Sequence, residues 1–377
     1  MSGTRIIPRM PSADALNLFD LERAARERVQ AMAYDYFASG ADDERALRRN
    51  REAFERLTLW PRVLGGADAP DTRVTLLGRE HPWPLLVAPT AFQRLAHPDG
   101  ELATARAAAS AGVTNVLSTL SSVSMEEAAA AGGPRWFQLY VFRDREITRS
   151  LVARAEAAGY EALVVTVDAP VLGRRERDAR NRFELPEGVV AANLQEGATR
   201  HVRSDGSESG LLQYFASQID PALTWHDLDW LHAQTSMPVV VKGILRADDA
   251  ELAVEHGAAG VIVSNHGGRQ LDAAPAAIEA LPAVAAAVGS RADVLMDGGV
   301  RRGTDVVAAL ASGARAVLIG RPVLWGLATG GEPGARRVLE MLHEEFVRAL
   351  ALCGCRSVGD VGPWLLGPGS VLPAGRG

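Results

Sequence analysis

The stretch GVIVSNHGGRQLD, residues 260–272, passes from an apolar run into a polar end. The β-branched side chains at 261–263 are typical of a strand covered on both faces, because they fill a pleated, buried surface. The run stops at Ser264, and His266, a glycine pair and Arg269 follow at once. A buried strand that ends in an imidazole and a guanidinium predicts a site at the end of that strand.

The same pattern, a short apolar run followed by turn residues, recurs along the chain. The eight runs expected to form strands lie at 84–91, 114–119, 135–141, 162–168, 238–244, 260–266, 293–299 and 316–322. Helical stretches lie between them, among them 100–112, 145–159, 246–258 and 302–314. Eight strand–helix units predict an α/β fold, the TIM (β/α)8 barrel. A doubly wound sheet is the alternative, but it would place a GxGxxG after its first strand, and PTAFQRLAHPDG (89–100) lacks one.

The remaining segments are expected to belong to the same single domain, residues 1–377. Residues 1–80 form an N-terminal extension with helical parts, and 323–377 form the last helix and a tail. Residues 169–223 form a long polar connection after the fourth strand. So long a connection inside a compact domain is usually an active-site lid or a mobile loop.

Composition excludes several classes of protein. The net charge of −6 gives no reason to expect a nucleic-acid partner. No apolar stretch reaches the roughly 18 residues that suggest a membrane span, and the amino terminus lacks the apolar core of a secretory signal. The two cysteines, Cys353 and Cys355, suit neither a disulfide framework nor a zinc site and are expected to be buried thiols. We expect a cytoplasmic protein without a bound metal.

Polar residues follow nearly every predicted strand, where a barrel carries its active site. They are Thr90, Ser118, Thr119, Gln138, Tyr140, Thr166, Asp168, Lys242, Ser264, His266, Asp297, Gly320 and Arg321. Any one alone is best explained as a loop-capping residue, but together at one rim they predict a polar ligand.

Two glycine-rich segments indicate a phosphate. DGGVRRGTD (297–305) and IGRP (319–322) follow the seventh and eighth strands, where these barrels usually bind phosphate. Such loops also occur merely as tight turns, but the arginines favour an anion. Lys242, the only lysine, could form a Schiff base, pair with a phosphate or offset negative charge on a cofactor ring. The three valines that precede it disfavour a fully solvated lysine.

The opening stretch then suggests acid–base chemistry. An imidazole at a strand end can accept a proton near neutral pH, and the planar fork of Arg269 suits a carboxylate. The glycines between them would let a ligand approach the backbone. An isolated histidine is more often a satisfied core residue, but Asp168 at another strand end could orient the ring of His266. A catalytic base is therefore the favoured interpretation.

Six segments, taken together, resemble the FMN-dependent 2-hydroxy acid oxidase and dehydrogenase family, to which glycolate oxidase, lactate oxidase and mandelate dehydrogenase belong. They are FQLYVF (137–142), TVDAPVLGRRERDARNRF (166–183), VVKGI (240–244), SNHGGRQLD (264–272), DGGVRRGTD and IGRP. The resemblance runs from YDYFASGADDE (34–44) to LALCGCRSV (350–358), nearly the whole chain. It implies FMN as cofactor and a 2-hydroxy acid as substrate.

The resemblance also implies residue roles. His266 would be the catalytic base and Asp168 would hold its ring. The residues that would bind the substrate carboxylate and hydroxyl are Arg175, Arg269, Tyr36 and Tyr140. Lys242 would stabilise the reduced flavin. The residues that would contact the flavin ring or ribityl chain are Pro89, Thr90, Ala91, Ser118, Gln138, Thr166, Ser264 and Asp297. Those that would hold the phosphate are Gly299, Arg301, Gly320 and Arg321.

Departures from the family bear on the substrate. Leu120 replaces a tryptophan of glycolate oxidase and Val171 replaces an arginine, while Phe142 would add an apolar wall. FQRLAHPDGELA (92–103) and TLSSVSMEE (119–127) look most like hydroxymandelate oxidases. These features favour mandelate or 4-hydroxymandelate as the substrate. A repacked lid is the equal alternative, with glycolate, lactate or a long-chain 2-hydroxy acid as substrate.

The polar segment 178–223 lacks the hydrophobic insertion of membrane-bound relatives, which favours O2 as acceptor and H2O2 as product. A soluble dehydrogenase with another acceptor is the alternative.

Hydride transfer is favoured over a carbanion, although the sequence leaves both open. Relatives form tetramers or octamers, so the resemblance implies a homo-oligomer. Two rival classes are an FMN-dependent isomerase without a carboxylate clamp and a catalytically silent barrel; the paired arginines and the retained base disfavour both.

Overall fold

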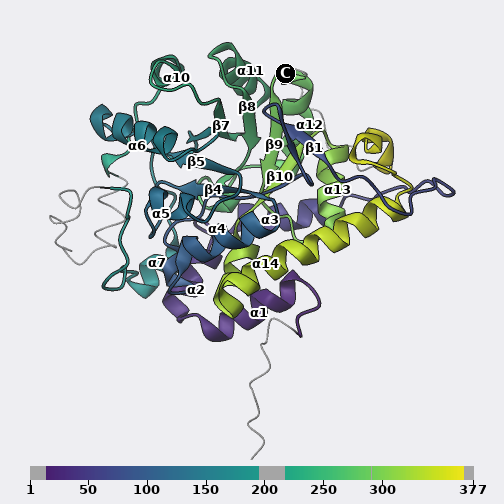
Figure 1. Cartoon of the computed structure of the whole chain (residues 1–377), viewed down its shortest axis with the longest axis horizontal. Helices are drawn as coiled ribbons and strands as arrows, with labels where there is room; N and C mark the ends of the chain where they lie inside the picture. The colour runs from purple at the N-terminus through teal and green to yellow at the C-terminus, as the bar shows by residue number, and fades with distance from the viewer. Residues whose placement is uncertain (1–13, 195–216, 290, 369–377) are drawn as a thin grey trace, which may run out of the picture.

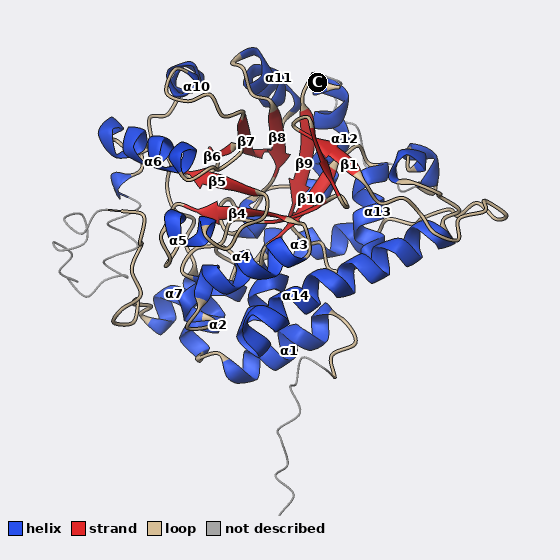
Figure 2. Ribbon diagram, in the orientation of Figure 1, coloured by secondary structure: helices blue, strands red, loops and turns tan. Residues whose placement is uncertain are grey.

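The computed structural model describes residues 14–194, 217–289 and 291–368, and its centre is a closed barrel of parallel strands. The strands follow one another around the barrel in chain order from β3 to β10, and β10 pairs with β3 to close it (Figure 2). They are β3 (Leu85–Val87), β4 (Thr114–Ser118), β5 (Arg135–Leu139), β6 (Leu163–Thr166), β7 (Val239–Ile244), β8 (Gly260–Val263), β9 (Asp293–Asp297) and β10 (Ala316–Ile319). The predicted TIM barrel is confirmed.

Helices surround the barrel and cover the outer face of its strands (Figure 1). They are α4 (Gly100–Ser110), α5 (Met125–Ala129), α6 (Arg145–Ala157), α10 (Trp225–His232), α11 (Ala247–Glu255), α12 (Ala277–Val288), α13 (Gly303–Ala311) and α14 (Arg321–Leu352). The last predicted strand was too long at its end. β10 stops at Ile319, and Arg321 is already the first residue of α14.

The barrel interior is a packed core rather than a channel. Each strand contributes at least one buried side chain to a single inner cluster, which includes Leu86, Val116, Trp136, Val164, Val240, Ile262, Leu295 and Leu318. Alternate residues of the same strands, such as Val241 and Val263, pack outward against the helices. Because both faces are buried, the strands are continuously apolar, as the sequence suggested.

An antiparallel hairpin that the sequence did not predict lies at the end of the barrel where the strands begin. Its strands are β1 (Val74–Leu76) and β2 (Arg79–His81), joined by a turn in which Leu77 and Gly78 both have positive φ. Leu76 is buried in the inner cluster, and the backbone N–H of Leu77 donates to Asp293 at the start of β9, at 2.7 Å.

The described part of the N-terminal extension contains helices, as predicted, namely α1 (Leu18–Arg28), α2 (Ala31–Ala38) and α3 (Arg45–Glu55). Asn17 caps α1 by accepting from two backbone N–H groups. Figure 1 shows α1 and α2 beside α14 at one end of the molecule. The long connection after β6 carries α7 (Glu176–Asn181), which lies next to α2. Part of this connection, residues 195–216, lies outside the described residues.

Candidate active site

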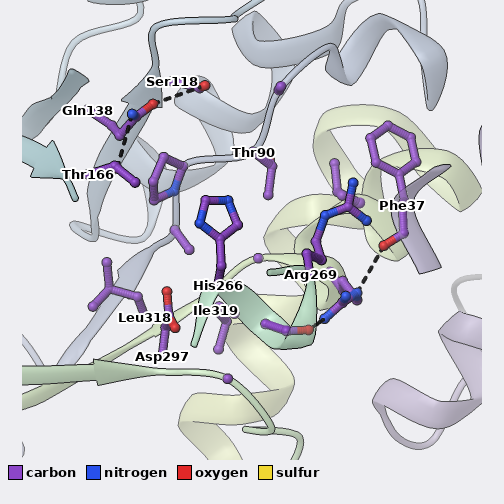
Figure 3. A pocket seen from close by; sticks show the side chains of 18 of the residues that line it. Phe37, Thr90, Ser118, Gln138, Thr166, His266, Arg269, Asp297, Leu318 and Ile319 are labelled. Atoms are coloured by element: carbon purple, nitrogen blue, oxygen red, sulfur yellow. Dashed lines mark hydrogen bonds between the residues drawn. The ribbon is translucent and has the colours of Figure 1, made fainter. Parts of the chain in front are cut away.

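The ends of the barrel strands surround one cavity. Its lining includes every residue to which the resemblance gave a catalytic or binding role except Asp168 and Ser264. The expected residues that line it are Tyr36, Pro89, Thr90, Ala91, Ser118, Leu120, Gln138, Tyr140, Thr166, Arg175, Lys242, His266, Arg269, Asp297, Gly299, Arg301, Gly320 and Arg321. Figure 3 shows the ring of His266 among them, with Gln138 and Thr166 on one side and Arg269 on the other.

His266 and Asp168 form a partly buried pair, of which His266 lines the cavity. Nδ1 of His266 lies 2.8 Å from Oδ1 of Asp168. Although burial opposes ionisation of Asp168, His266 lowers the pKa of that carboxyl below its usual range. Burial lowers the pKa of His266 in spite of the opposing charge of Asp168. The ionised carboxylate then accepts from Nδ1–H, so the neutral ring keeps Nε2 as the atom that can take a proton.

The turn that carries His266 is held in an uncommon conformation. His266 has a φ of 56°, in the left-handed region that non-glycine residues seldom occupy. Its backbone N–H donates to Ser264 at 3.0 Å, and the Asn265 side chain accepts from the N–H of Gly268 at 3.0 Å. Asn265 also exchanges two hydrogen bonds, of 2.9 and 2.8 Å, with Asn50 of α3. Asn50 of the N-terminal extension therefore helps to hold the turn that carries His266.

Two arginines and a tyrosine lie at one side of the cavity. One Nη of Arg269 donates to the backbone carbonyls of Tyr36 and Ser39, at 2.6 and 3.1 Å. Burial, helped by the charge of Arg175, lowers the pKa of Arg269 to about 10. Nε of Arg175 is buried without a hydrogen-bond partner among the described residues. Two cations crowded together with an unused donor form a place for an anion.

Two tyrosines belong to this lining: Tyr36 is buried and Tyr140 is partly buried. The ring of Tyr36 stacks on Phe183 at 4.6 Å, and the guanidinium of Arg269 lies 5.3 Å from its centroid. Burial, together with the charge of Asp168, raises the pKa of Tyr140 to about 12. Tyr140 therefore keeps its proton at neutral pH and can donate a hydrogen bond.

Lys242 is buried at the end of β7, as its three preceding valines suggested. Its Nζ donates to Oγ of Ser264 at 3.0 Å and lies 3.2 Å from Oδ2 of Asp297. Burial opposes its charge, but Asp297 and Asp168 raise its pKa above the usual value. Lys242 is thus a fixed cation that faces the cavity.

Hydrogen bonds join the ends of β4, β5 and β6 (Figure 3). Oγ of Ser118 donates to Oε1 of Gln138 at 3.2 Å, and Nε2 of Gln138 donates to Oγ1 of Thr166 at 3.1 Å. All three side chains are buried. They give the cavity a polar wall whose donors and acceptors are fixed.

The glycine-rich loops after β9 and β10 carry two partly buried arginines, Arg301 and Arg321. Burial lowers the pKa of Arg301, and burial with the charges of Arg269 and Arg301 lowers that of Arg321 to about 9. Arg321 donates to three backbone carbonyls, those of Phe37, Gly267 and Ser39, at 2.9–3.0 Å. This part of the cavity keeps a positive charge that an anion would stabilise.

Several sequence interpretations need correction. Ser264 is fully buried and does not line the cavity; its hydroxyl lies beneath Lys242 and the turn of His266. Phe142 packs in the core and does not form the predicted apolar wall, and Val171 is exposed and does not line the cavity. Thr119, one of the strand-end residues, is buried and bonds the backbone of Gln138.

The role given to the glycines is also only partly right. Gly267 lines the cavity, but a Cβ on Gly268 would lie 2.5 Å from the backbone N of Leu47. A Cβ on Gly299 would lie 2.2 Å from the carbonyl oxygen of Asn50. Both glycines also have positive φ. Close packing of α3, rather than room for a ligand, therefore requires glycine at 268 and 299.

Sequence reasoning missed part of the site. The lining residues it did not name are Phe37, Ala88, Leu172, Ile219, Gly298, Val300, Leu318, Ile319, Pro322 and Leu324. Gly298 stands in the quoted DGG and could have been included. Leu172 and Ile219 belong to the long connection, whose path no local pattern gives.

The cavity fits FMN, the cofactor that the sequence resemblance implied. Partly buried Arg269 and Arg321 have lowered pKa values, as expected where an anionic group belongs. Oδ1 of Asp297 is buried without a hydrogen-bond partner among the described residues, which leaves an acceptor for a ligand. Aliphatic side chains of Leu318 and Ile319 lie across the same cavity from polar Gln138, which suits a flat ring with polar edges.

Comparisons with known proteins agree with this site. A family model described as FMN-dependent dehydrogenase matches residues 25–368. An L-lactate oxidase of Nostoc sp. is 54% identical over 351 residues, which are 92% of this chain and 96% of that protein. Glycolate oxidase 3 of Arabidopsis thaliana is 50% identical over 346 residues, which are 92% and 94% of the two chains.

A solved structure of mandelate oxidase with (S)-4-hydroxymandelic acid has a TM-score of 0.89 and 50% identity to this chain. The match covers 94% of this chain and 98% of that one. The family, the cofactor and the type of reaction are therefore shown. The chain belongs to the FMN-dependent dehydrogenase family and is an FMN-dependent oxidase of 2-hydroxy acids.

Proposed function

We propose that this enzyme oxidises an aromatic (S)-2-hydroxy acid, mandelate or 4-hydroxymandelate, to the 2-oxo acid, with O2 as acceptor and H2O2 as product. The observation that carries the chemistry is the convergence of His266, Arg269 and Arg175 on one cavity. A 2-hydroxy acid presents a carboxylate and a hydroxyl on one carbon, and this cavity offers a cationic pair beside a base.

His266 is proposed as the catalytic base. Its Nε2 would accept the proton of the substrate hydroxyl as the Cα–H bond breaks, and the charge that the ring gains would be stabilised by Asp168 at 2.8 Å. The lowered pKa of His266 keeps the ring neutral and ready to accept that proton. We favour loss of the Cα hydrogen with its electron pair over prior removal as a proton, because a clamped substrate presents one fixed Cα–H direction.

Arg175 and Arg269 are proposed to bind the substrate carboxylate, with Tyr36 beside them. The unused buried Nε of Arg175 supports this role, since a carboxylate would supply its missing partner. Tyr140, whose raised pKa keeps it protonated, would donate to the substrate hydroxyl oxygen. Together these groups would fix the orientation of Cα over the cofactor.

When bound, FMN supplies the two-electron acceptor of the reaction. Lys242 is proposed to offset negative charge on its ring, and Arg301 and Arg321, with Gly299 and Gly320, to hold its phosphate. The residues proposed to contact its ring and ribityl chain are Pro89, Thr90, Ala91, Ser118, Gln138, Thr166 and Asp297. Ser264 is proposed to act through Lys242 rather than by contact.

Three aliphatic side chains support an aromatic substrate. Leu120, Leu172 and Ile219 line the same cavity as Tyr140 and Arg175. An aromatic group buried against them would gain on the order of 1.5–3 kcal/mol, whereas the hydrogen of glycolate would leave that surface uncovered. The likeness to a mandelate oxidase that binds (S)-4-hydroxymandelic acid points the same way.

Oxidation of lactate or glycolate is the alternative, favoured by the 54% identity to an L-lactate oxidase. A substrate panel separates the two. The purified holoenzyme would be assayed with (S)-mandelate, (S)-4-hydroxymandelate, (S)-lactate, glycolate and 2-hydroxyoctanoate for product and peroxide together. We expect the largest kcat/KM for an aromatic acid, with one peroxide per product. The largest kcat/KM for glycolate or lactate would refute the aromatic substrate.

The same assay tests the acceptor. Rapid dye reduction without peroxide in air would refute O2 as acceptor while leaving the substrate assignment intact.

No helix in the described part of the chain is long and apolar enough to cross a membrane. A cytoplasmic location and a homo-oligomeric assembly are further proposals; the buried, unlinked thiols of Cys353 and Cys355 agree with a reducing compartment.

A further inference from the structure

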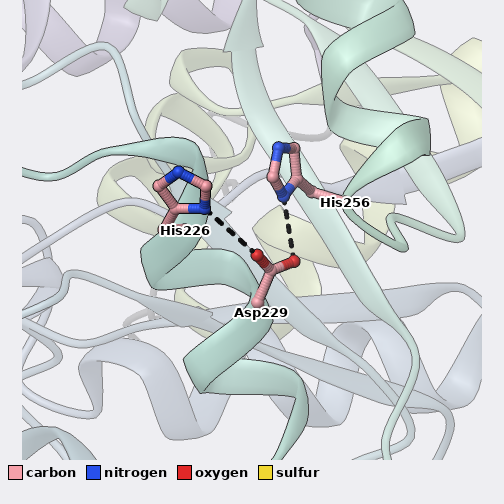
Figure 4. A group of neighbouring side chains, drawn as sticks. All are labelled: His226, Asp229 and His256. Atoms are coloured by element: carbon pink, nitrogen blue, oxygen red, sulfur yellow. Dashed lines mark hydrogen bonds and ion pairs between the residues drawn. The ribbon is translucent and has the colours of Figure 1, made fainter.

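Two histidines and an aspartate form a cluster on the outer surface of the barrel, away from the lining of the active-site cavity. His226 and Asp229 belong to α10, and His256 is the residue that ends α11 (Figure 4). Because His226 and Asp229 are three positions apart on one helix, their side chains share a face. This face meets the end of α11, so three potential metal ligands come from two elements.

The spacing of the ligand atoms is close to what a metal needs. Nδ1 of His256 lies 2.9 Å from Oδ1 of Asp229, and Nδ1 of His226 lies 3.5 Å from Oδ2. All three ligand atoms lie within 4.8 Å of one another. Tetrahedral ligands at about 2.0–2.1 Å from Zn²⁺ are about 3.3 Å apart, so small rotations of the side chains would be sufficient.

The chemistry of the cluster selects the kind of cation. Two imidazole nitrogens and one carboxylate oxygen suit Zn²⁺ and its transition-metal neighbours, whereas Mg²⁺ and Ca²⁺ prefer oxygen ligands alone. The carboxylate of Asp229 carries a negative charge at neutral pH. One negative charge and two neutral rings would leave a bound divalent ion with a net positive charge and an open position for water.

The three ligands are not equally fixed. The ring of His256 is 20% exposed and lies parallel to that of Trp225, with centroids 6.3 Å apart. Asp229 is 53% exposed and His226 is 89% exposed. His256 and Asp229 therefore form the prepared half of the site, and His226 would complete it at the cost of its own side-chain freedom.

We propose that His226, Asp229 and His256 bind one transition-metal dication, with Zn²⁺ as the reference ion, and so tie α10 to the end of α11. The proposal is independent of the oxidation reaction, because none of the three residues lines the active-site cavity. In the absence of metal, the same side chains form the hydrogen-bonded group that Figure 4 draws.

The test uses tag-free holoenzyme, stripped of adventitious metal by a chelator. Co²⁺ is titrated and its visible absorption bands are measured in difference spectra, and Zn²⁺ binding is measured by calorimetry. We expect one ion per chain, displacement of Co²⁺ by Zn²⁺ and no competition from Mg²⁺. Asp229→Asn and His256→Asn should each weaken binding at least about 10-fold, and His226→Asn should weaken it less.

His232→Asn is the matched control, since His232 lies on α10 but outside the cluster. It should bind the ion like the wild type, and all four variants should keep their flavin and their activity. Absence of binding would overturn the proposal. So would binding that persists in Asp229→Asn and His256→Asn, because the three side chains would then be a hydrogen-bonded group only.

Discussion

Nδ1 of His266 lies 2.8 Å from Oδ1 of Asp168, although 98 residues separate them in the chain. The pair forms because parallel strands β6 and β8 deliver both residues to the same rim of the barrel. The side chain of Gln270 fixes the loop of Asp168 by donating to its carbonyl oxygen at 2.8 Å. The imidazole is therefore held in one orientation before any substrate arrives.

Asp168→Asn should lower kcat by about 10²- to 10⁴-fold, because an amide can stabilise the wrong tautomer of His266 and cannot stabilise its cation. The pH profile gives a second signature. Asp168 raises the pKa of His266 against the effect of burial, so removing its charge should move the acid limb of kcat/KM to lower pH. Steady-state kinetics across pH on flavin-loaded protein measures both. An acid limb that moves to higher pH would contradict the pairing.

Arg175→Lys should raise KM for a 2-hydroxy acid more than it lowers kcat, because an ammonium cannot reproduce the planar fork. We expect a loss of about 10-fold or more in kcat/KM, and a much smaller loss with the neutral amide of mandelate, which carries no charge to bind. Arg174→Lys, at the exposed neighbouring position, is the control. Equal losses with acid and amide would show that Arg175 does not bind the carboxylate.

Leu120→Trp should change the preference for substrates rather than the chemistry. The larger ring would fill the space beside Leu172 and Ile219, so kcat/KM for mandelate should fall by roughly 10- to 100-fold while that for glycolate changes little. Val171→Trp, at a side chain that is 69% exposed, should leave both values near those of the wild type. If Leu120→Trp lowered kcat/KM for mandelate and glycolate equally, Leu120, Leu172 and Ile219 would not form the specificity pocket.

Asn50→Asp should weaken the support of the catalytic turn. The carboxylate introduced by this substitution could not donate a hydrogen bond to Oδ1 of Asn265. Two buried oxygen atoms, both hydrogen-bond acceptors, would then face each other. We expect kcat to fall about 10-fold or more. KM should change little, because the substitution leaves the residues that bind the substrate carboxylate intact. Glu52→Gln, at an exposed position on α3, is the matched control. A change confined to the melting temperature would mean that Asn50 serves stability alone.

Strand ends were the part of the site that the sequence could predict. Val240 points into the barrel core, so Lys242, two residues later, points the same way at the mouth. Ser264 defied this reasoning because it follows the last residue of β8 and turns beneath Lys242. The alternation that places side chains within a strand gives no guidance beyond its end.

Contacts between distant segments that do not end barrel strands were out of reach. Asn50 pairs with Asn265 across 215 residues, and no local pattern near either residue indicates the other. Ile219 lines the cavity because an isolated bridge pairs it with Phe142, which leaves Phe142 itself in the core. The β1–β2 hairpin was missed because strands of three residues are too short to show periodicity.

The central claim is that His266, which lines the same cavity as Arg175 and Arg269, acts as the base on a 2-hydroxy acid. It is tested most directly by anaerobic mixing of flavin-loaded wild type and His266→Gln with (S)-mandelate, followed by loss of the yellow flavin absorbance. We predict rapid bleaching of the wild type and bleaching about 10²- to 10⁴-fold slower in the variant, with equal flavin content. Equal rates in the two proteins, or a wild type that holds flavin and is bleached by no 2-hydroxy acid, would contradict the account.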